Sequence, residues 1–286
     1  MNLGHLFCFG YGYSARCFAQ GLINKGWTVS ASSRSVGKDI TDDITFIDFN
    51  IINEAVFENV THILVSIPPD AKGDPVLLKY AHIITENQHL RWIGYLSTTG
   101  VYGNTDGALV DECSVLNPTT ERSKHRLAAE QSWLGLYSIH GLPIHVFRLA
   151  GIYGPGRNTL KQVLAGRAQR IEQPGHKFSR IHVEDIARVL TASIAKPDPG
   201  EAYNVCDDEP ASQSDVVAFA CKILDIDPPS PIAFREAKKL MSPMAQSFWK
   251  DNRLVDNSKI KEGLGVSLLY PTYRNGLRAI FQNGVG

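Results

Sequence analysis

Residues 6–22, LFCFGYGYSARCFAQGL, decide the fold that we expect for this chain. The apolar run at residues 6–9 predicts a buried strand, and the glycines after it predict a tight turn into a helix. In the spacing Gly10-x-Gly12-x-x-Ala15, the first glycine lets the strand turn sharply, the second lets the backbone approach a pyrophosphate, and alanine lets the helix pack against the strand. The start of that helix offers free N–H groups to phosphate. The stretch therefore predicts a dinucleotide-binding turn.

Composition narrows the possible partners. The 286 residues contain 29 acidic and 29 basic side chains, so no overall charge attracts nucleic acid or an anionic membrane. The five cysteines are odd in number and lack a CxxC pair, which indicates reduced thiols rather than a disulfide framework or a metal site. The chain shows no signal-peptide pattern and no apolar run long enough to cross a membrane. We expect a soluble, cytoplasmic protein that acts on a small molecule, and a homodimer is a possible assembly.

Strand and helix patterns alternate along the chain. Strand patterns occupy residues 27–34, 44–49, 61–68, 92–103, 143–154 and 201–208, and a long helix pattern occupies 118–138. Alternation of this kind predicts an α/β fold with a doubly wound parallel sheet of the Rossmann type. We expect residues 1–150 and 176–208 to form the cofactor-binding domain. Residues 151–175 and 209–286, with more proline and less periodicity, are expected to form a smaller C-terminal substrate lobe.

The end of the second predicted strand indicates which cofactor is bound. NAD binders carry an acidic residue there for the ribose 2′-hydroxyl, whereas this chain has Ser33 and Arg34, with Lys38 nearby and no carboxylate before Asp39. NADP is therefore favoured over NAD, although Arg34 is also compatible with a solvated surface position. Asp48 is a candidate partner for the adenine amino group or, alternatively, a helix cap.

Several motifs in order resemble a known family. They are the GxGxxA turn, SSR at 32–34, STTGVYG at 97–103, RLAGIYGPGRN at 148–158, RIHVEDIA at 180–187 and AYNVCDDEP at 202–210. This series resembles the extended short-chain dehydrogenase/reductase family, the NAD(P)-dependent epimerases and dehydratases of nucleotide sugars. The resemblance covers nearly the whole chain. One departure is the glycine spacing, since the family usually has GxxGxxG, and this points to its atypical members.

The resemblance implies catalytic positions, one of which is altered. Thr98 matches the family's active-site hydroxyl, Lys124 matches the lysine that holds the nicotinamide ribose, and Asp74 occupies the position of the helix asparagine. The family's acid/base tyrosine is replaced by Thr120, whose hydroxyl is far less acidic than a phenol. The cofactor residues expected from motif and resemblance together are Gly10, Gly12, Tyr13, Ser14, Ala15, Ser33, Arg34, Lys38, Asp48, Ser66 and Lys124.

Other residues near these motifs are candidates for the missing role or for substrate binding. The possible substitutes for the tyrosine are Tyr102, His125, Tyr153 and His182. Of these, Tyr102 and His182 are the preferred candidates. The expected substrate-binding residues are Arg148, Arg157, Arg180 and His182. Thr119 and Thr120 have an alternative interpretation as a helix cap.

Two function classes remain open from the sequence. The first is an NADP-dependent oxidoreductase or epimerase with a non-standard acid, acting on a small or nucleotide-linked polyol or carbonyl compound. The second is a catalytically inactive NADP-binding sensor or scaffold.

Overall fold

The computed structural model describes residues 3–34 and 44–284, and its centre is a seven-stranded sheet in the order β11-β7-β5-β4-β1-β2-β3. Every neighbouring pair is parallel, which confirms the predicted doubly wound α/β fold. The strands are β1 (His5–Phe9), β2 (Thr28–Ser33), β3 (Thr45–Asp48), β4 (His62–Val65), β5 (Trp92–Thr98), β7 (Ile144–Leu149) and β11 (Ala202–Val205). The order reverses between β1 and β4, the position where ligands bind in such sheets.

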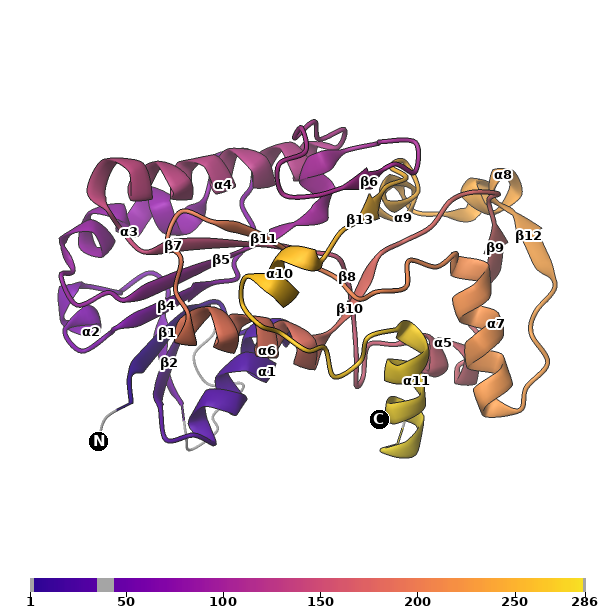
Figure 1. Ribbon diagram of the computed structural model, residues 1–286, viewed down its shortest axis with the longest axis horizontal. Helices are drawn as coiled ribbons and strands as arrows, with labels where there is room; N and C mark the ends of the chain where they lie inside the picture. Colours follow the sequence, from indigo (N-terminus) through magenta and orange to yellow (C-terminus); the bar gives the residue numbers. More distant parts are fainter. Residues whose placement is uncertain (1–2, 35–43, 285–286) are drawn as a thin grey trace.

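Helices cover both faces of this sheet (Figure 1). On one face α1 packs against α6, and on the other α4 packs against α3, β5 and β7. The helices around the sheet are α1 (Tyr13–Ile23), α2 (Glu54–Phe57), α3 (Pro75–Glu86), α4 (Glu121–His140), α6 (Val183–Ala195) and α10 (Ser258–Glu262). Because both faces are covered, the central strands are largely buried, and β4 and β7 are buried at every position.

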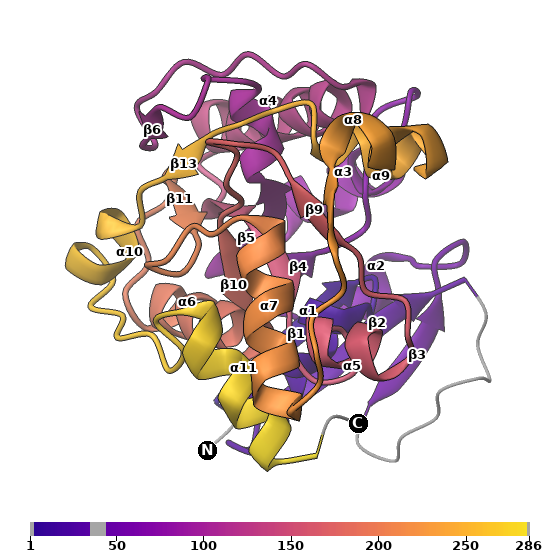
Figure 2. The same cartoon turned by 90° about the vertical axis from the view of Figure 1, so that its right-hand side faces the viewer.

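A smaller lobe lies at the carboxyl end of the sheet (Figures 1 and 2). Its elements are β8 (Gly151–Tyr153), β9 (Arg170–Glu172), β10 (Arg180–His182), β12 (Pro231–Ala233), α5 (Thr159–Leu164), α7 (Gln213–Leu224), α8 (Phe234–Ala237), α9 (Pro243–Phe248) and α11 (Tyr273–Gln282). Helices α5, α7 and α11 share their own apolar core, which includes Leu160, Phe219 and Leu277.

The C-terminal segment contributes to both parts of the molecule. Strand β13 (Leu254–Val255) pairs with β6 (Leu109–Val110), and Ile260 of α10 belongs to the core beside α1 and α6. The expected division into residues 1–150 with 176–208, and 151–175 with 209–286, stays a prediction. Among the described residues no helix is long and apolar enough to cross a membrane, and the five cysteines carry free thiols.

We expect Gly103→Ala to lower the free energy of unfolding by about 1–3 kcal/mol. Gly103 has a φ of +69°, and an added Cβ would collide with the carbonyl oxygen of Asn117. Gly21→Ala on α1 is the matched control, because a Cβ there meets nothing within 4 Å. This control should gain up to about 1 kcal/mol. Chemical denaturation of the three proteins measures both changes, and equal stability of Gly103→Ala and wild type would contradict the expectation.

Candidate functional site

The turn between β1 and α1 is shaped by Gly10. Its φ is +85°, and an added Cβ would lie 2.9 Å from both Ser66 Oγ and Ile67 Cγ1 at the end of β4. Glycine is therefore required by the backbone conformation and by the close approach of β4. Ser66 donates its hydroxyl to the carbonyl oxygens of Phe9 and Gly10, which fixes the turn.

Gly12 precedes the first turn of α1 and leaves space in front of it. It is the N-cap of α1 without a side-chain cap, and an added Cβ would meet no atom of the described residues within 4 Å. Ala15 is fully buried against the sheet, as the fingerprint predicts. The helix N-terminus thus faces an open cavity with its N–H groups, an arrangement that suits phosphate.

This first cavity has a volume of about 560 Å³ and lies at the ends of β1, β2 and β4. Its lining residues are Gly10, Tyr11, Gly12, Ser32, Ser33, Arg34, Phe46, Phe49, Ser66, Ile67, Pro68, Asp70 and Pro75. Apolar walls with a few polar groups at the turn fit an adenosine with its phosphates. The structure thus brings Gly10, Gly12, Ser33, Arg34 and Ser66 together.

The remaining expected cofactor residues lie around this cavity. Tyr13 donates its hydroxyl to the carbonyl oxygen of Pro155, and Ser14 is buried in the first turn of α1. Asp48 is outside the lining and accepts a hydrogen bond from the N–H of Asn50. Lys38 lies outside the described residues.

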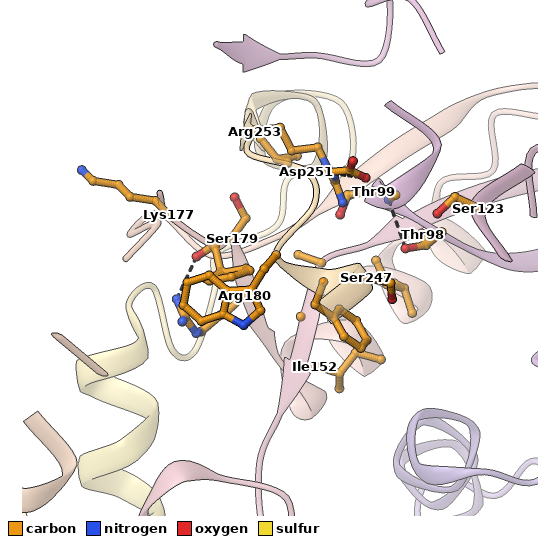
Figure 3. Close-up of a pocket in the computed structure, with 18 of the residues that line it drawn as sticks. Thr98, Thr99, Ser123, Ile152, Lys177, Ser179, Arg180, Ser247, Asp251 and Arg253 are labelled. Carbon is orange, nitrogen blue, oxygen red and sulfur yellow. Dashed lines mark hydrogen bonds and ion pairs between the residues drawn. The ribbon is translucent and has the colours of Figure 1, made fainter. Parts of the chain in front are cut away.

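A second cavity of about 380 Å³ lies at the carboxyl ends of β5 and β7, beside the first turn of α4 (Figure 3). Thr98 and Ser123 line one end, and Lys177 and Arg180 lie toward the other. The cavity also contains Thr120, so the structure brings two of the predicted catalytic positions together. Thr98 Oγ1 accepts from the N–H of Gly100 at 3.1 Å, and its own hydroxyl proton remains available to a ligand.

Thr120 caps helix α4. Its backbone is extended, with φ −108° and ψ 147°, and its Oγ1 accepts from the N–H of Ser123 at 3.2 Å. The same hydroxyl donates to Ser123 Oγ at 2.9 Å. The contacts of Thr120 are therefore those of a helix cap, and its hydroxyl both donates and accepts a hydrogen bond within the protein.

Lys124 is not brought to Thr98. Its ammonium pairs with Glu121 at 2.8 Å, the side chain is 54% exposed, and Lys124 is outside the residues that line the second cavity. The physical reason is the cap: a one-turn spacing places two side chains on one face only when both residues are helical, and Thr120 is not. The helix instead turns Ser123 and Arg122 toward the cavity, and sequence reasoning missed both. The cap pattern of Thr119 and Thr120 was the available signal for this register.

Asp74 and Tyr102 are buried away from both cavities. Asp74 caps α3 by accepting from the N–H groups of Val76 and Leu77, and Trp133 Nε1 donates to it at 3.2 Å. The hydroxyl of Tyr102 donates to Asn204 Oδ1 at 2.7 Å. Burial raises the pKa of Tyr102 to about 12, so it stays protonated at neutral pH.

The predicted substrate-binding residues occupy different places. Arg148 is 4% exposed, pairs with Glu130 at 2.5 Å and donates to the Tyr102 hydroxyl, so it supports the sheet rather than lining a cavity. Arg157 lies in a separate hollow beside α5. Arg180 lines the second cavity while its Nη1 donates to the carbonyl oxygens of Phe178 and Ala211.

The histidine and tyrosine side chains considered as replacements for the catalytic tyrosine differ in their position and protonation. His182 caps α6 by accepting at Nδ1 from the N–H of Glu184, and burial lowers its pKa to about 4, so it is neutral at neutral pH. Tyr153 lines the second cavity, but burial strongly raises its pKa. His125 is half-buried on α4 outside the lining. His182 and Tyr153 are therefore not ready bases at neutral pH.

We expect Glu130→Ala to destabilise the fold by about 3–5 kcal/mol, because it leaves the buried Arg148 guanidinium without its counter-charge. The control is Glu121→Ala, which removes an exposed ion pair with Lys124 and should change stability by less than about 1 kcal/mol. Urea denaturation of both variants separates the two cases. Similar losses in the two variants would contradict the structural role given to the Arg148–Glu130 pair.

Comparisons with known proteins agree with this architecture. The model of the NAD dependent epimerase/dehydratase family matches residues 70–206. A functionally unknown conserved protein from Silicibacter pomeroyi DSS is 45% identical and has a TM-score of 0.89, over 98% of this chain and 99% of that one. The dTDP-glucose 4,6-dehydratase of Bacillus anthracis, solved in complex with NAD, shares the fold at 18% identity and a TM-score of 0.77, over 98% and 96% of the two chains.

Curated relatives are matched over part of their length. Protein YeeZ of Escherichia coli K12 is 27% identical over 177 residues, 62% of this chain and 58% of YeeZ. The dTDP-glucose 4,6-dehydratase of Neisseria gonorrhoeae is 26% identical over 200 residues, 66% of this chain and 58% of the relative. The chain thus spans less than two thirds of the length of these relatives.

Proposed function

Because the model of the NAD dependent epimerase/dehydratase family matches residues 70–206, we propose that the chain is an NADP-dependent oxidoreductase or epimerase acting on a small or nucleotide-linked polyol or carbonyl compound. The observation that carries the proposal is the pair of cavities at the carboxyl edge of one parallel sheet. One has the glycine turn and apolar walls for an adenosine, and the other has hydroxyl donors for a reacting carbonyl. The lobe of residues 151–175 and 209–286 is proposed to contribute to substrate binding.

The preference for NADP is supported by the rim of the first cavity. Ser33 ends β2 and Arg34 follows it, so a hydroxyl and a guanidinium stand where NAD-binding proteins use a carboxylate. A guanidinium matches the geometry of a phosphate and forms charge-assisted hydrogen bonds with it. A ribose 2′-phosphate therefore fits this rim better than a free 2′-hydroxyl does.

The chemistry proposed for the second cavity uses the residues that reach it. NADP, when bound, supplies hydride transfer to or from a carbon atom of the substrate. Thr98 has a hydroxyl proton to donate to the substrate oxygen, and Ser123 lies beside it. Thr120, as a cap, holds Ser123 and the helix start in place rather than moving a proton. A cytoplasmic location and a homodimer stay predictions.

We expect the wild-type protein to bind NADPH more tightly than NADH, by roughly tenfold to hundredfold, and Arg34→Ala to lose most of that difference. Arg34→Ala should leave the NADH affinity unchanged, since that cofactor has no 2′-phosphate. Fluorescence titration of both cofactors into both proteins measures the four affinities.

Gly12→Val is the companion variant for the turn. Its side chain would enter the open space before α1, so both cofactors should fail to bind while the fold persists. Equal wild-type affinities for NADPH and NADH in the titration above would contradict the proposed preference for NADP. Normal cofactor binding by a folded Gly12→Val protein would contradict the proposed dinucleotide site.

One observation favours a second function, an NADP-binding sensor or scaffold without turnover. The Thr120 hydroxyl is engaged in capping and the Lys124 ammonium is paired with Glu121 at the surface. Single-turnover absorbance measurements separate the two functions. NADPH oxidation is followed with a panel of carbonyl compounds and NADP⁺ reduction with a panel of nucleotide-linked polyols, because an epimerase begins from the oxidised cofactor. Tight NADPH binding with no change of the cofactor in either panel would support the sensor.

A further inference from the structure

We propose that the second cavity recognises an oxyanion, a carboxylate or phosphate carried by a small substrate, and that Arg122 is the residue that binds it. This inference rests on the proposed function only in taking the second cavity as the substrate site. It adds a residue and a substrate class that the resemblance did not indicate.

Arg122 is placed to bind a ligand. It lies in the first turn of α4, lines the second cavity, and its guanidinium carbon is 4.8 Å from the centre of the Phe248 ring. Among the described residues no carboxylate pairs with it. Its neighbours on the helix differ, since Lys124 pairs with Glu121 and Arg126 donates to the carbonyl oxygen of Leu96 at 2.7 Å. Arg122 therefore keeps a planar set of donors that matches an oxyanion.

The cavity around Arg122 is rich in positive charge. Lys177, Arg180 and Arg253 line it as well, and Asp251 is the one carboxylate among the described lining residues (Figure 3). Asp251 is already engaged, because it accepts from Thr119 Oγ1 at 2.5 Å and from Arg253 Nη1 at 3.2 Å. Because Asp251 offsets the charge of Arg253, the three remaining cations, Arg122, Lys177 and Arg180, favour an anionic ligand.

The charge of Arg180 is also left uncompensated near neutral pH. The facing carboxyl is Asp207, which is 1% exposed and has an oxygen without a hydrogen-bond partner among the described residues. Burial raises the pKa of Asp207 to about 8, against the opposing effect of Arg180. The raised pKa favours the neutral form of Asp207, and Arg180 forms no ion pair among the described residues, so its guanidinium charge remains available to a ligand.

Size and wall packing indicate a small ligand. A volume of about 380 Å³ is near the lower end for ligand cavities, and the nicotinamide end of the cofactor must share it. The ring of Trp249 is already packed by other rings: Phe234 stacks on it at 5.0 Å, His176 lies 5.3 Å away, and Phe178 meets it edge-on. A nucleotide base would find this aromatic surface occupied, so a carboxylate or phosphate monoester of a few carbons fits better.

The test measures anion binding directly. Inorganic phosphate, acetate and the uncharged acetamide are titrated by calorimetry, at constant ionic strength and pH 7, into wild type saturated with NADPH. The variants are Arg122→Ala, Arg122→Lys and the control Arg235→Ala, which removes an arginine that is 90% exposed on α8. Circular dichroism and the NADPH affinity of each variant report whether the fold and the cofactor site are intact.

We expect wild type and Arg235→Ala to bind at least one of the two anions and not acetamide. Arg122→Ala should weaken anion binding at least about tenfold, and Arg122→Lys should retain part of it, because the charge remains while the planar fork is lost. Unchanged anion affinity in Arg122→Ala, or acetamide binding as tight as acetate, would overturn the assignment. A nucleoside diphosphate sugar is titrated in the same way. If it binds wild type more tightly than either anion does, and binds Arg122→Ala equally well, the assignment of Arg122 is also overturned. The same anion titrations are repeated without cofactor, and failure of wild type to bind NADPH, with the cofactor-free anion result intact, would instead overturn the proposed function alone.

Discussion

The positive φ of Gly10 at the end of β1 is the constraint on which the ligand-binding edge of the molecule depends. It turns the chain so that α1 begins immediately in front of the sheet, while Ser66 and Ile67 at the end of β4 close against the same residue. A side chain at Gly10 would collide with the side chains of Ser66 and Ile67, just after β4, at the point where the strand order reverses. The first cavity depends on Gly10 having no side chain, so that these two side chains can close against its backbone.

The start of α4 has a comparable influence on the second cavity. Thr120 stops the helix from extending one residue further back, and Gly100 lets Ser123 approach the loop after β5, since an added Cβ would lie 2.6 Å from Ser123 Oγ. The buried pair of Arg148 and Glu130 ties this helix to β7 beneath the cavity. The geometry that presents Arg122 and Thr98 to a ligand thus follows from one cap and one buried ion pair.

The sequence was most informative where local chemistry alone determines structure. The glycine turn, the apolar strands and the strand-helix alternation predicted the doubly wound sheet, because each is set by steric and solvation effects within a few residues. The side-chain partners at the site were less predictable, since they depend on contacts across the fold. Asp74 meets Trp133 and Arg148 meets Glu130 over separations of 59 and 18 residues, which no local pattern reports. Lys124 shows the same limit, since its direction depends on where the helix begins.

The most direct measurement is a crystal structure of the protein grown with NADPH and phosphate. We expect the adenosine to lie in the first cavity, between Gly12 and Arg34, with its 2′-phosphate within hydrogen-bond distance of Arg34. The nicotinamide ring should lie in the second cavity, beside Thr98. A dinucleotide bound elsewhere, or a 2′-phosphate directed into solvent away from Arg34, would contradict it.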